Sequence, residues 1–143
     1  MQLQNCINYL LTVAQHEVHQ NISEKLSQFN ITPGQYGVLN CLWQYGSCTP
    51  REIAQTLRLE NSTISGVLDR MQKRGLIDRV VDPNDRRSVR VITTEEGSSL
   101  REDVLRAVDE LNAEIGGVYD PEQWNNFLEM LREIGKIELP KDN

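Results

Sequence analysis

The fold of this chain is decided by residues 49–97, which run TPREIAQTLRLENSTISGVLDRMQKRGLIDRVVDPNDRRSVRVITTEEG. Thr49 and Glu52 form a capping box with a proline at the first helical position, and this pattern predicts a helix that starts at residue 50. Residues 59–61 form the turn, and a second helix capped by Asn61 is expected to follow. Four apolar residues of this second helix recur at spacings of three and four and must face a core: Ile64, Val67, Leu68 and Met71. Helix, tight turn and helix over about residues 50–73 indicate a helix-turn-helix.

The opposite face of the second helix is unusual for a surface that meets only water. At about 100° per residue, this face carries Ser62, Ser65, Gly66, Asp69, Arg70 and Lys73. A glycine inside a helix costs roughly 1 kcal/mol relative to alanine, and burial does not explain Gly66 because it lies away from the apolar stripe. Close approach to the major groove of DNA would explain it. Ser62, Thr63 and Ser65 lie near the helix N-terminus, where they can reach base edges or phosphates.

A β-hairpin is predicted directly after the second helix. Lys73-Arg74-Gly75 is a basic last turn closed by a glycine, and strands are expected at residues 76–81 and 88–93. The connection, DPNDRR over residues 82–87, is rich in turn formers and carries two arginines at its tip. Taken alone, this loop is explained equally well as a solvated basic turn. After a helix-turn-helix it indicates a wing, whose arginine can enter a narrow A·T-rich minor groove.

Three runs carry a family resemblance: LIDR at residues 76–79, DPNDRRS at 82–88 and ITTEEG at 92–97. Together they resemble the signature of the MarR family of bacterial transcriptional regulators, and the resemblance covers nearly the whole chain. It implies that residues 61–74 are the recognition helix and that Arg87 of the wing reaches the minor groove. Asp85 is then expected to orient an arginine, with Arg86 near phosphate. The resemblance also implies a homodimer whose interface is formed by the first, fifth and sixth helices.

The helix face and the resemblance together give a set of residues expected to contact double-stranded DNA. They are Asn61, Ser62, Thr63, Ser65, Gly66, Arg70, Lys73, Arg86 and Arg87. Two-fold symmetry would present two recognition helices about 34 Å apart, one turn of B-DNA, so the operator is expected to be a pseudo-palindrome. The expected function is a ligand-responsive, sequence-specific transcriptional regulator that acts as a repressor.

The rest of the chain is predicted to be helical. Apolar residues keep a helical period from Leu3 to Phe29, a segment too long to pack within one small domain. Thr32 caps the next helix, and Thr93 with Glu96 is expected to cap a long fifth helix. Gly116-Gly117 breaks the chain, and Asp120-Pro121 starts a last helix. The predicted fold class is mainly α with a small β-hairpin wing.

The domain organisation expected from these elements is a single domain over residues 1–143. Dimerisation helices are expected at 1–31 and 98–137, a winged-helix lobe at 32–97, and the wing itself at 77–93. No internal repeat interrupts this order.

The net charge of the chain is −6, but the charge is unevenly distributed, and its distribution favours DNA binding. Residues 51–90 hold nine Lys or Arg against six Asp or Glu, a net charge of +3, whereas the remainder holds six against fifteen, a net charge of −9. A basic lobe on an acidic body still binds phosphates. No run of about 18 apolar residues predicts a membrane span and no signal peptide is recognisable, so a cytoplasmic location is expected.

Several other functions are less well supported by the residues. No nucleophile has a recognisable base, so an enzyme is not expected, and no cofactor is implied. His16 and His19 have no metal-ligand spacing with a further ligand. Thiol oxidation at Cys6 is an alternative signal, although the sequence shows no cationic neighbour of Cys6 that would activate the thiol. Cys41 is expected in the core and Cys48 is expected to be partly exposed. A winged-helix adaptor that binds only proteins is a second alternative.

The resemblance further implies a small aromatic or anionic effector bound between the dimerisation helices and the winged helix. Four side chains are candidates for this crevice: Tyr9, His16, Tyr36 and Trp43. Taken singly, each of these residues is better explained as part of the core, because an aromatic residue at helical spacing is usually buried there.

Overall fold

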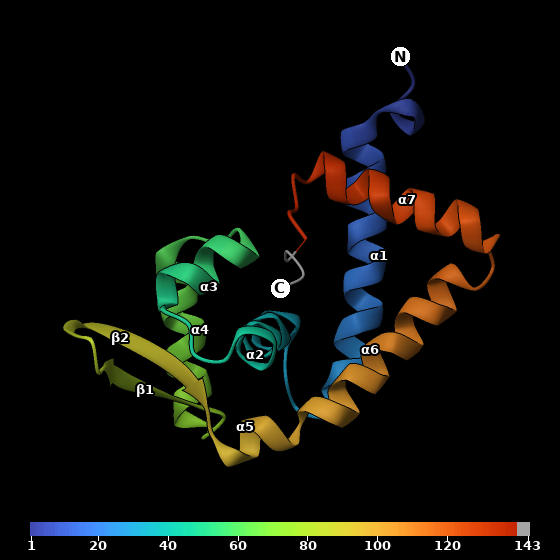
Figure 1. The fold of residues 1–143 in the computed structure, drawn as a ribbon. Helices are drawn as coiled ribbons and strands as arrows, with labels where there is room; N and C mark the ends of the chain where they lie inside the picture. Colours follow the sequence, from blue (N-terminus) through green and yellow to red (C-terminus); the bar gives the residue numbers. More distant parts are fainter. Residues whose placement is uncertain (140–143) are drawn as a thin grey trace. The chain divides into compact units, whose positions relative to one another are not determined.

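The computed structural model describes residues 1–139, which are mainly helical and contain one two-stranded hairpin (Figure 1). The chain divides into two compact units, residues 1–108 and 109–143. In chain order the elements are η1 (Leu3–Asn5), α1 (Ile7–Ser27), α2 (Pro33–Tyr45), α3 (Pro50–Leu57), α4 (Asn61–Lys73), β1 (Ile77–Asp82), β2 (Asp85–Thr93), α5 (Glu95–Ser99), α6 (Arg101–Gly116) and α7 (Pro121–Ile134). The predicted fold class, mainly α with a β-hairpin wing, is confirmed. None of the described helices is long and apolar enough to cross a membrane.

The starts of α2 and α3 follow the caps that the sequence predicts, whereas the predicted cap of α4 is wrong. Thr49 Oγ1 accepts from the Glu52 amide at 3.1 Å, and Glu52 Oε1 accepts from the Thr49 amide at 3.3 Å. Thr32 forms the same capping box with Gln35. The expected cap by Asn61 is wrong, because Asn61 is already helical and Glu60 occupies the N-cap without a side-chain bond.

The end of α4 is closed by a Schellman motif. Gly75 has a φ of +83°, its amide donates to Gln72 O at 3.0 Å, and the Leu76 amide donates to Met71 O at 3.1 Å. The predicted glycine stop is therefore confirmed. It turns the chain directly from α4 into β1.

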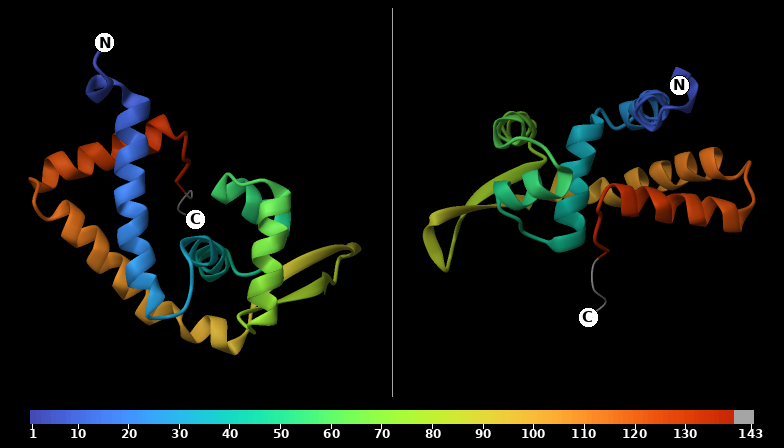
Figure 2. Two further views of the ribbon diagram at one scale, coloured as in Figure 1. Left: turned by 180° about the vertical axis from the view of Figure 1, so that it is seen from behind. Right: turned by 90° about the horizontal axis from the view of Figure 1, so that it is seen from above.

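The hairpin is antiparallel and starts its second strand earlier than predicted. Ile77 pairs with Thr93 and Val81 with Val89, and the register shifts between Val81 and Asp82. A two-residue turn, Pro83-Asn84, joins the strands, so β2 begins at Asp85 and not at Ser88. The two arginines that were expected at a loop tip therefore lie on the strand. Figure 2 shows the hairpin projecting away from α4.

The core of the first unit lies where α2, α3 and α4 meet the base of the hairpin. Its fully buried side chains include Leu39, Ile53, Leu68, Met71 and Val91. A short second backbone pairing lies beside the hairpin, since Cys48 and Val91 exchange hydrogen bonds of 3.2 and 2.7 Å. This pairing fastens the loop between α2 and α3 to β2.

Two predicted helices differ from the structure. The first is interrupted, because Cys6 is extended between η1 and α1, and Phe29 lies beyond the end of α1. The predicted cap by Thr93 is wrong, because Thr93 pairs with Ile77 in the hairpin, and Thr94 instead accepts from the Gly97 amide at 3.1 Å. The expected long fifth helix is divided at Leu100 into α5 and α6.

In the second unit, α6 ends at Gly116 and α7 begins after Asp120, as predicted. Asp120 Oδ2 accepts from the Gln123 amide at 3.2 Å. A Cβ on Gly116 would lie 2.5 Å from the Trp124 ring, so this glycine allows the ring to pack on the end of α6. The same ring stacks on Tyr119, with centroids 5.7 Å apart.

Substitution of Gly97 by alanine should destabilise the first unit. A Cβ at Gly97 would lie 2.1 Å from Leu76 O, a backbone atom that cannot move away cheaply. We expect the free energy of unfolding to fall by about 2 kcal/mol, measured by urea denaturation. Gly34→Ala is the matched control, because its Cβ would meet only Thr32 Oγ1 at 3.9 Å. Equal stability of the two variants would contradict the close contact.

Candidate nucleic-acid interface

Helix α4 presents the face that the sequence predicts. Ile64, Leu68 and Met71 are buried, and Val67 packs half-buried against them. Gly66 is half-buried, and the remaining predicted contact residues of α4 are exposed: Asn61, Ser62, Thr63, Ser65, Arg70 and Lys73. The buried stripe therefore fixes which side of α4 faces outward.

Nothing in the described fold requires a glycine at position 66. A Cβ there would meet only the guanidinium of Arg70, at 3.6 and 3.9 Å, and this flexible group can give way. The position differs in this respect from Gly97 and Gly116, where an added Cβ would collide. A helix-interior glycine without an internal reason is consistent with close approach of another molecule.

A hollow of about 480 Å³ joins the outer face of α4 to the hairpin. Its lining combines the start of α3, the face of α4 and both strands: Pro50, Arg51, Asn61, Ser65, Leu68, Arg79, Arg87, Ser88 and Val89. The structure thus brings together Arg87 and the α4 residues Asn61 and Ser65, which the sequence placed in separate elements. It adds Arg51 and Arg79, which the sequence reasoning missed as site residues; Arg51 is exposed on α3, and Arg79 is half-buried on β1.

Arg79 also braces the hairpin. Its Nη2 lies 2.8 Å from Asp69 Oδ1, an ion pair between β1 and α4. Asp69 lies on the exposed face of α4, so this carboxylate is used to orient the wing beside the helix. The ion pair is partly exposed and contributes little stability by itself.

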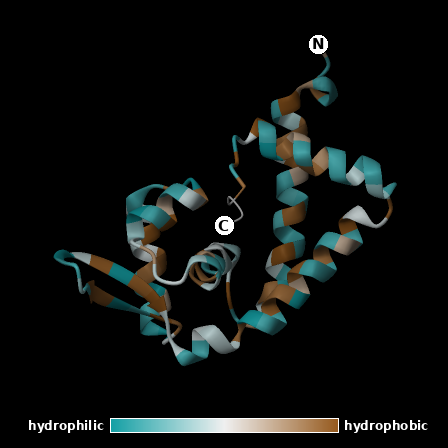
Figure 3. Ribbon diagram, viewed as in Figure 1, coloured by the Kyte–Doolittle hydropathy of each residue, from teal (hydrophilic) through white to brown (hydrophobic). Residues whose placement is uncertain are grey.

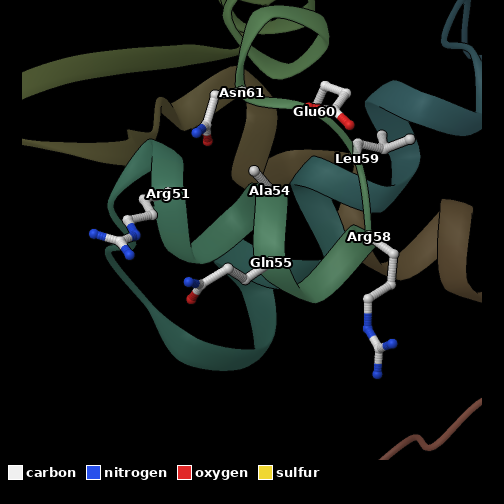
Figure 4. A pocket seen from close by; sticks show the side chains of 7 residues that line it. All are labelled: Arg51, Ala54, Gln55, Arg58, Leu59, Glu60 and Asn61. Carbon is white, nitrogen blue, oxygen red and sulfur yellow. The ribbon is translucent and has the colours of Figure 1, made fainter.

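A second hollow, of about 460 Å³, lies at the turn between α3 and α4 (Figure 4). Figure 4 shows Arg51 and Arg58 reaching away from α3 on opposite sides, with Gln55 between them. Arg58 is in the left-handed conformation, with a φ of 55°, and its amide closes the end of α3 on Ala54 O and Gln55 O. Cations on either side of a helix-turn-helix are placed to meet phosphates of a DNA backbone.

Asp85 contacts an arginine of the wing, as the family resemblance implies. Asp85 Oδ1 accepts from the Arg87 amide at 3.0 Å and from Arg87 Nε at 3.4 Å, so this aspartate orients Arg87. The Arg87 side chain is 93% exposed. Among residues 1–139, the cations Arg51, Arg70, Lys73 and Arg86 form no ion pair, which leaves their charge available to an anion.

The four candidate effector residues lie on α1 and α2. Tyr9 is half-buried and His16 exposed. The hydroxyl of Tyr36 accepts from Asn40 Nδ2 at 2.9 Å, and Trp43 Nε1 donates to Gly97 O at 3.1 Å. The polar atoms of Tyr36 and Trp43 therefore already have partners, and what these residues offer to a ligand is chiefly ring surface.

The cysteines differ in exposure. Cys41 is buried as expected, and burial raises its pKa to about 11. The expected partial exposure of Cys48 is wrong, because its backbone pairs with Val91 and its side chain is 4% exposed. Burial, followed by the nearby Glu52 carboxylate, raises the pKa of Cys48 as well. Cys6 is half-buried between η1 and α1.

Known proteins resemble this chain over most of its length. A model of the MarR family matches residues 31–89. The organic hydroperoxide resistance transcriptional regulator of Bacillus subtilis is 35% identical over 76% of this chain and 72% of its own. The HTH-type transcriptional regulator FarR of Neisseria gonorrhoeae is 30% identical over 92% of this chain and 90% of its own. The solved structure of CouR from Rhodococcus jostii RHA1 bound to p-coumaroyl-CoA is 27% identical, covers 99% of each chain and has a TM-score of 0.86.

Alkylation should separate the three thiols of the folded protein. Because thiolate is the reactive form, a pKa of about 11 leaves about one Cys41 in a thousand ionised at pH 8. We expect iodoacetamide at pH 8 to label Cys6 first and to reach Cys41 and Cys48 only slowly, as read by peptide mass spectrometry. Labelling in urea is the control, and there all three should react. Equal rates for Cys48 and Cys6 in the folded protein would contradict the burial of Cys48.

Proposed function

The chain belongs to the MarR family, and from that premise we propose that it is a ligand-responsive repressor that binds a pseudo-palindromic operator as a homodimer. The observation that carries this proposal is the hollow that is lined both by Arg87 of the wing and by Asn61 and Ser65 of α4. One basic surface then offers a helix to the major groove and an arginine to the adjacent minor groove.

In this proposal α4 is the recognition helix. Its first turns expose Ser62, Thr63 and Ser65, short hydroxyl side chains that let the helix axis come near the base pairs. Arg70 and Lys73 follow on the same face towards the helix end, where they are suited to meet phosphates. Base readout and backbone contact are therefore divided along one helix.

The wing adds shape readout. Arg86 and Arg87 directly follow Asp85, the first residue of β2, and the carboxylate of Asp85 orients Arg87. Arginine in a minor groove recognises the narrow groove of A·T-rich sequences through its electrostatic potential. The wing is therefore expected to sense the sequence that flanks the bases read by α4.

Apolar surface at both ends of the chain supports a homodimer. Leu3, Ile7 and Leu10 are between 46% and 60% exposed in η1 and α1. In α7, Phe127, Met130 and Ile134 are between 41% and 58% exposed, and no residue of this helix is buried. Figure 3 shows hydrophobic segments recurring along α1 among hydrophilic ones. Exposed apolar stripes of this size favour burial against a second copy.

A small aromatic or anionic effector completes the proposal. CouR, whose solved structure resembles this chain, was crystallised with p-coumaroyl-CoA, an anionic aromatic compound. The rings of Tyr9, Tyr36 and Trp43, with His16, are the candidate contacts in this chain. Binding there would release DNA if the ligand favours a dimer whose two recognition helices no longer match the groove spacing.

Selection of fragments of the source genome that bind the purified protein tests the function directly. We expect enrichment of sites with two similar half-sites, their centres about 10 base pairs apart, in opposite orientation. The enriched site serves as the operator in the measurements below. Failure to enrich any DNA would favour a protein-binding adaptor.

Gly66→Leu should separate folding from DNA binding. The fold should persist, and the helix should gain up to about 1 kcal/mol, because glycine is the poorer helix former. The larger side chain should nevertheless lower operator affinity by roughly a hundredfold through a clash with the groove. Gln44→Leu is the matched control, because Gln44 is exposed on α2 and does not belong to the proposed DNA contact residues. Full operator affinity of a folded Gly66→Leu protein would place this face away from DNA.

Arg87→Ala and Lys73→Ala should differ in how their effects depend on sequence. Loss of Arg87 should weaken binding most where the operator flanks are A·T-rich, and by more than about 1 kcal/mol per dimer. Loss of Lys73 should weaken binding evenly and lower the salt slope by about 0.9 for each lost phosphate contact, of which a dimer has two. Titrations with A·T-rich and G·C-rich flanks at several salt concentrations measure both effects. If Arg87→Ala lowered affinity equally for the operators with A·T-rich and G·C-rich flanks, the wing would not read the minor groove.

The protein should be a homodimer at micromolar concentration. Sedimentation equilibrium should give twice the chain mass of 16.4 kDa. Ile7→Glu and Phe127→Glu, which place charges on the two exposed apolar stripes, should shift the equilibrium towards monomer. A folded monomer that binds the operator with full affinity would rule out the dimer proposal.

A further inference from the structure

We propose that Arg90 is a positioning residue that holds the wing at the angle from which Arg87 reaches DNA. The proposal rests on the proposed function, because it concerns how the wing of that same site is aimed. Arg90 lies on β2 opposite Val80, three residues after Arg87.

The guanidinium of Arg90 is fixed on the loop that precedes α3. Its Nε donates to Ser47 Oγ at 2.8 Å, and its Nη2 donates to the backbone O of the same serine at 2.7 Å. A single hydrogen bond would leave this planar group free to rotate, whereas two bonds to the same residue define its orientation. The hairpin is thereby attached to the backbone of the helix-turn-helix lobe.

Two carboxylates from different elements complete the environment of Arg90. Nη1 lies 3.7 Å from Asp82 Oδ2 at the end of β1 and 3.9 Å from Glu52 Oε1 in the first turn of α3. The same Glu52 oxygen accepts from the Thr49 amide in the capping box of α3. One guanidinium therefore joins both strands of the hairpin to the loop and the start of the helix before α4.

Arg90 lies where support from the helical lobe ends. Nearer the core, Val91 pairs with Cys48 and Arg79 bonds to Asp69, at the same level of the ladder. Towards the tip, Val81 and Val89 are 60% and 40% exposed, although they form the next pair. A two-stranded ribbon with no packed face is flexible, so the last tether at its base determines where its tip lies.

The exposure of the two arginines separates their roles. The Arg90 side chain is 27% exposed and its donors are directed at Ser47, whereas the Arg87 side chain is 93% exposed. Arg90 is therefore a poor candidate for a phosphate contact and a good one for an anchor. Its effect on DNA binding should act through Arg87.

A double-mutant cycle on the A·T-flanked operator tests this dependence. Arg90→Met alone should lower affinity roughly tenfold, and the same substitution in an Arg87→Ala background should change affinity less than twofold. Ser47→Ala removes the Oγ acceptor without changing any charge, and it should lower affinity two- to threefold in the same direction, by an estimate based on one lost hydrogen bond of about 0.5 kcal/mol. Each variant must first unfold in urea at the same midpoint concentration as the wild-type protein.

Hydrogen exchange supplies a readout that does not involve DNA. Arg90→Met should increase exchange of the amides at residues 81–90, while the amides of α4 keep their wild-type protection. Equal protection of the wing in Arg90→Met and wild type would overturn the proposal. A general loss of protection would instead show a structural role for the whole lobe, which also overturns it.

The outcomes of the cycle distinguish this proposal from the function on which it rests. Suppose that Arg87→Ala weakens binding and that Arg90→Met lowers affinity as much in this background as in the wild-type protein. Arg90 then contacts DNA itself, and the positioning role is wrong. If Arg87→Ala has no effect on any flank, the wing is not a DNA reader, and the proposed wing function fails together with this inference.

Discussion

Burial of the apolar stripe of α4 is the constraint on which the rest of the surface depends. Ile64, Leu68 and Met71 are each at most 1% exposed and pack among α2, α3 and β1. Each such side chain contributes about 1.5–3 kcal/mol by leaving water. Because these residues lie on one side of a helix, the serines, Gly66 and Arg70 must lie on the other. Burial of the core therefore determines which face of α4 is turned outward.

The same core determines how the wing starts. The Schellman turn at Gly75 delivers Leu76 and Ile77 into the core directly after α4, so the hairpin begins against the helix that it serves. After the hairpin, Gly97 lets α5 approach the backbone of Leu76, and Trp43 of α2 donates to Gly97 O. The wing is therefore held at its base from both of its strands. Its tip has the exposure and charge that contact with DNA requires.

The arginines and lysines of this lobe divide into two groups. One group is available to attract phosphates, and the other orients the hairpin. Arg51, Arg70, Lys73 and Arg86 are exposed and form no ion pair within the described residues, so they can attract phosphates. Arg79, Arg87 and Arg90 each contact a carboxylate, which fixes where these arginines or their strands point. The acidic remainder of the chain disfavours binding to DNA in other orientations.

The sequence by itself determined the elements whose signals are local. The capping boxes at Thr32 and Thr49, the stop at Gly75 and the apolar period of α4 depend only on neighbours within about four residues, and all are present in the structure. The tertiary structure alone decided the start of β2, the cap at Thr94 in place of Thr93, and the burial of Cys48, because strand pairing across the chain fixes each of them. It also decided that Arg79 and Arg90 brace the wing, since their partners, Asp69 and Ser47, lie 10 and 43 residues away. A local pattern cannot encode a contact whose partner is brought near only by packing of the whole lobe.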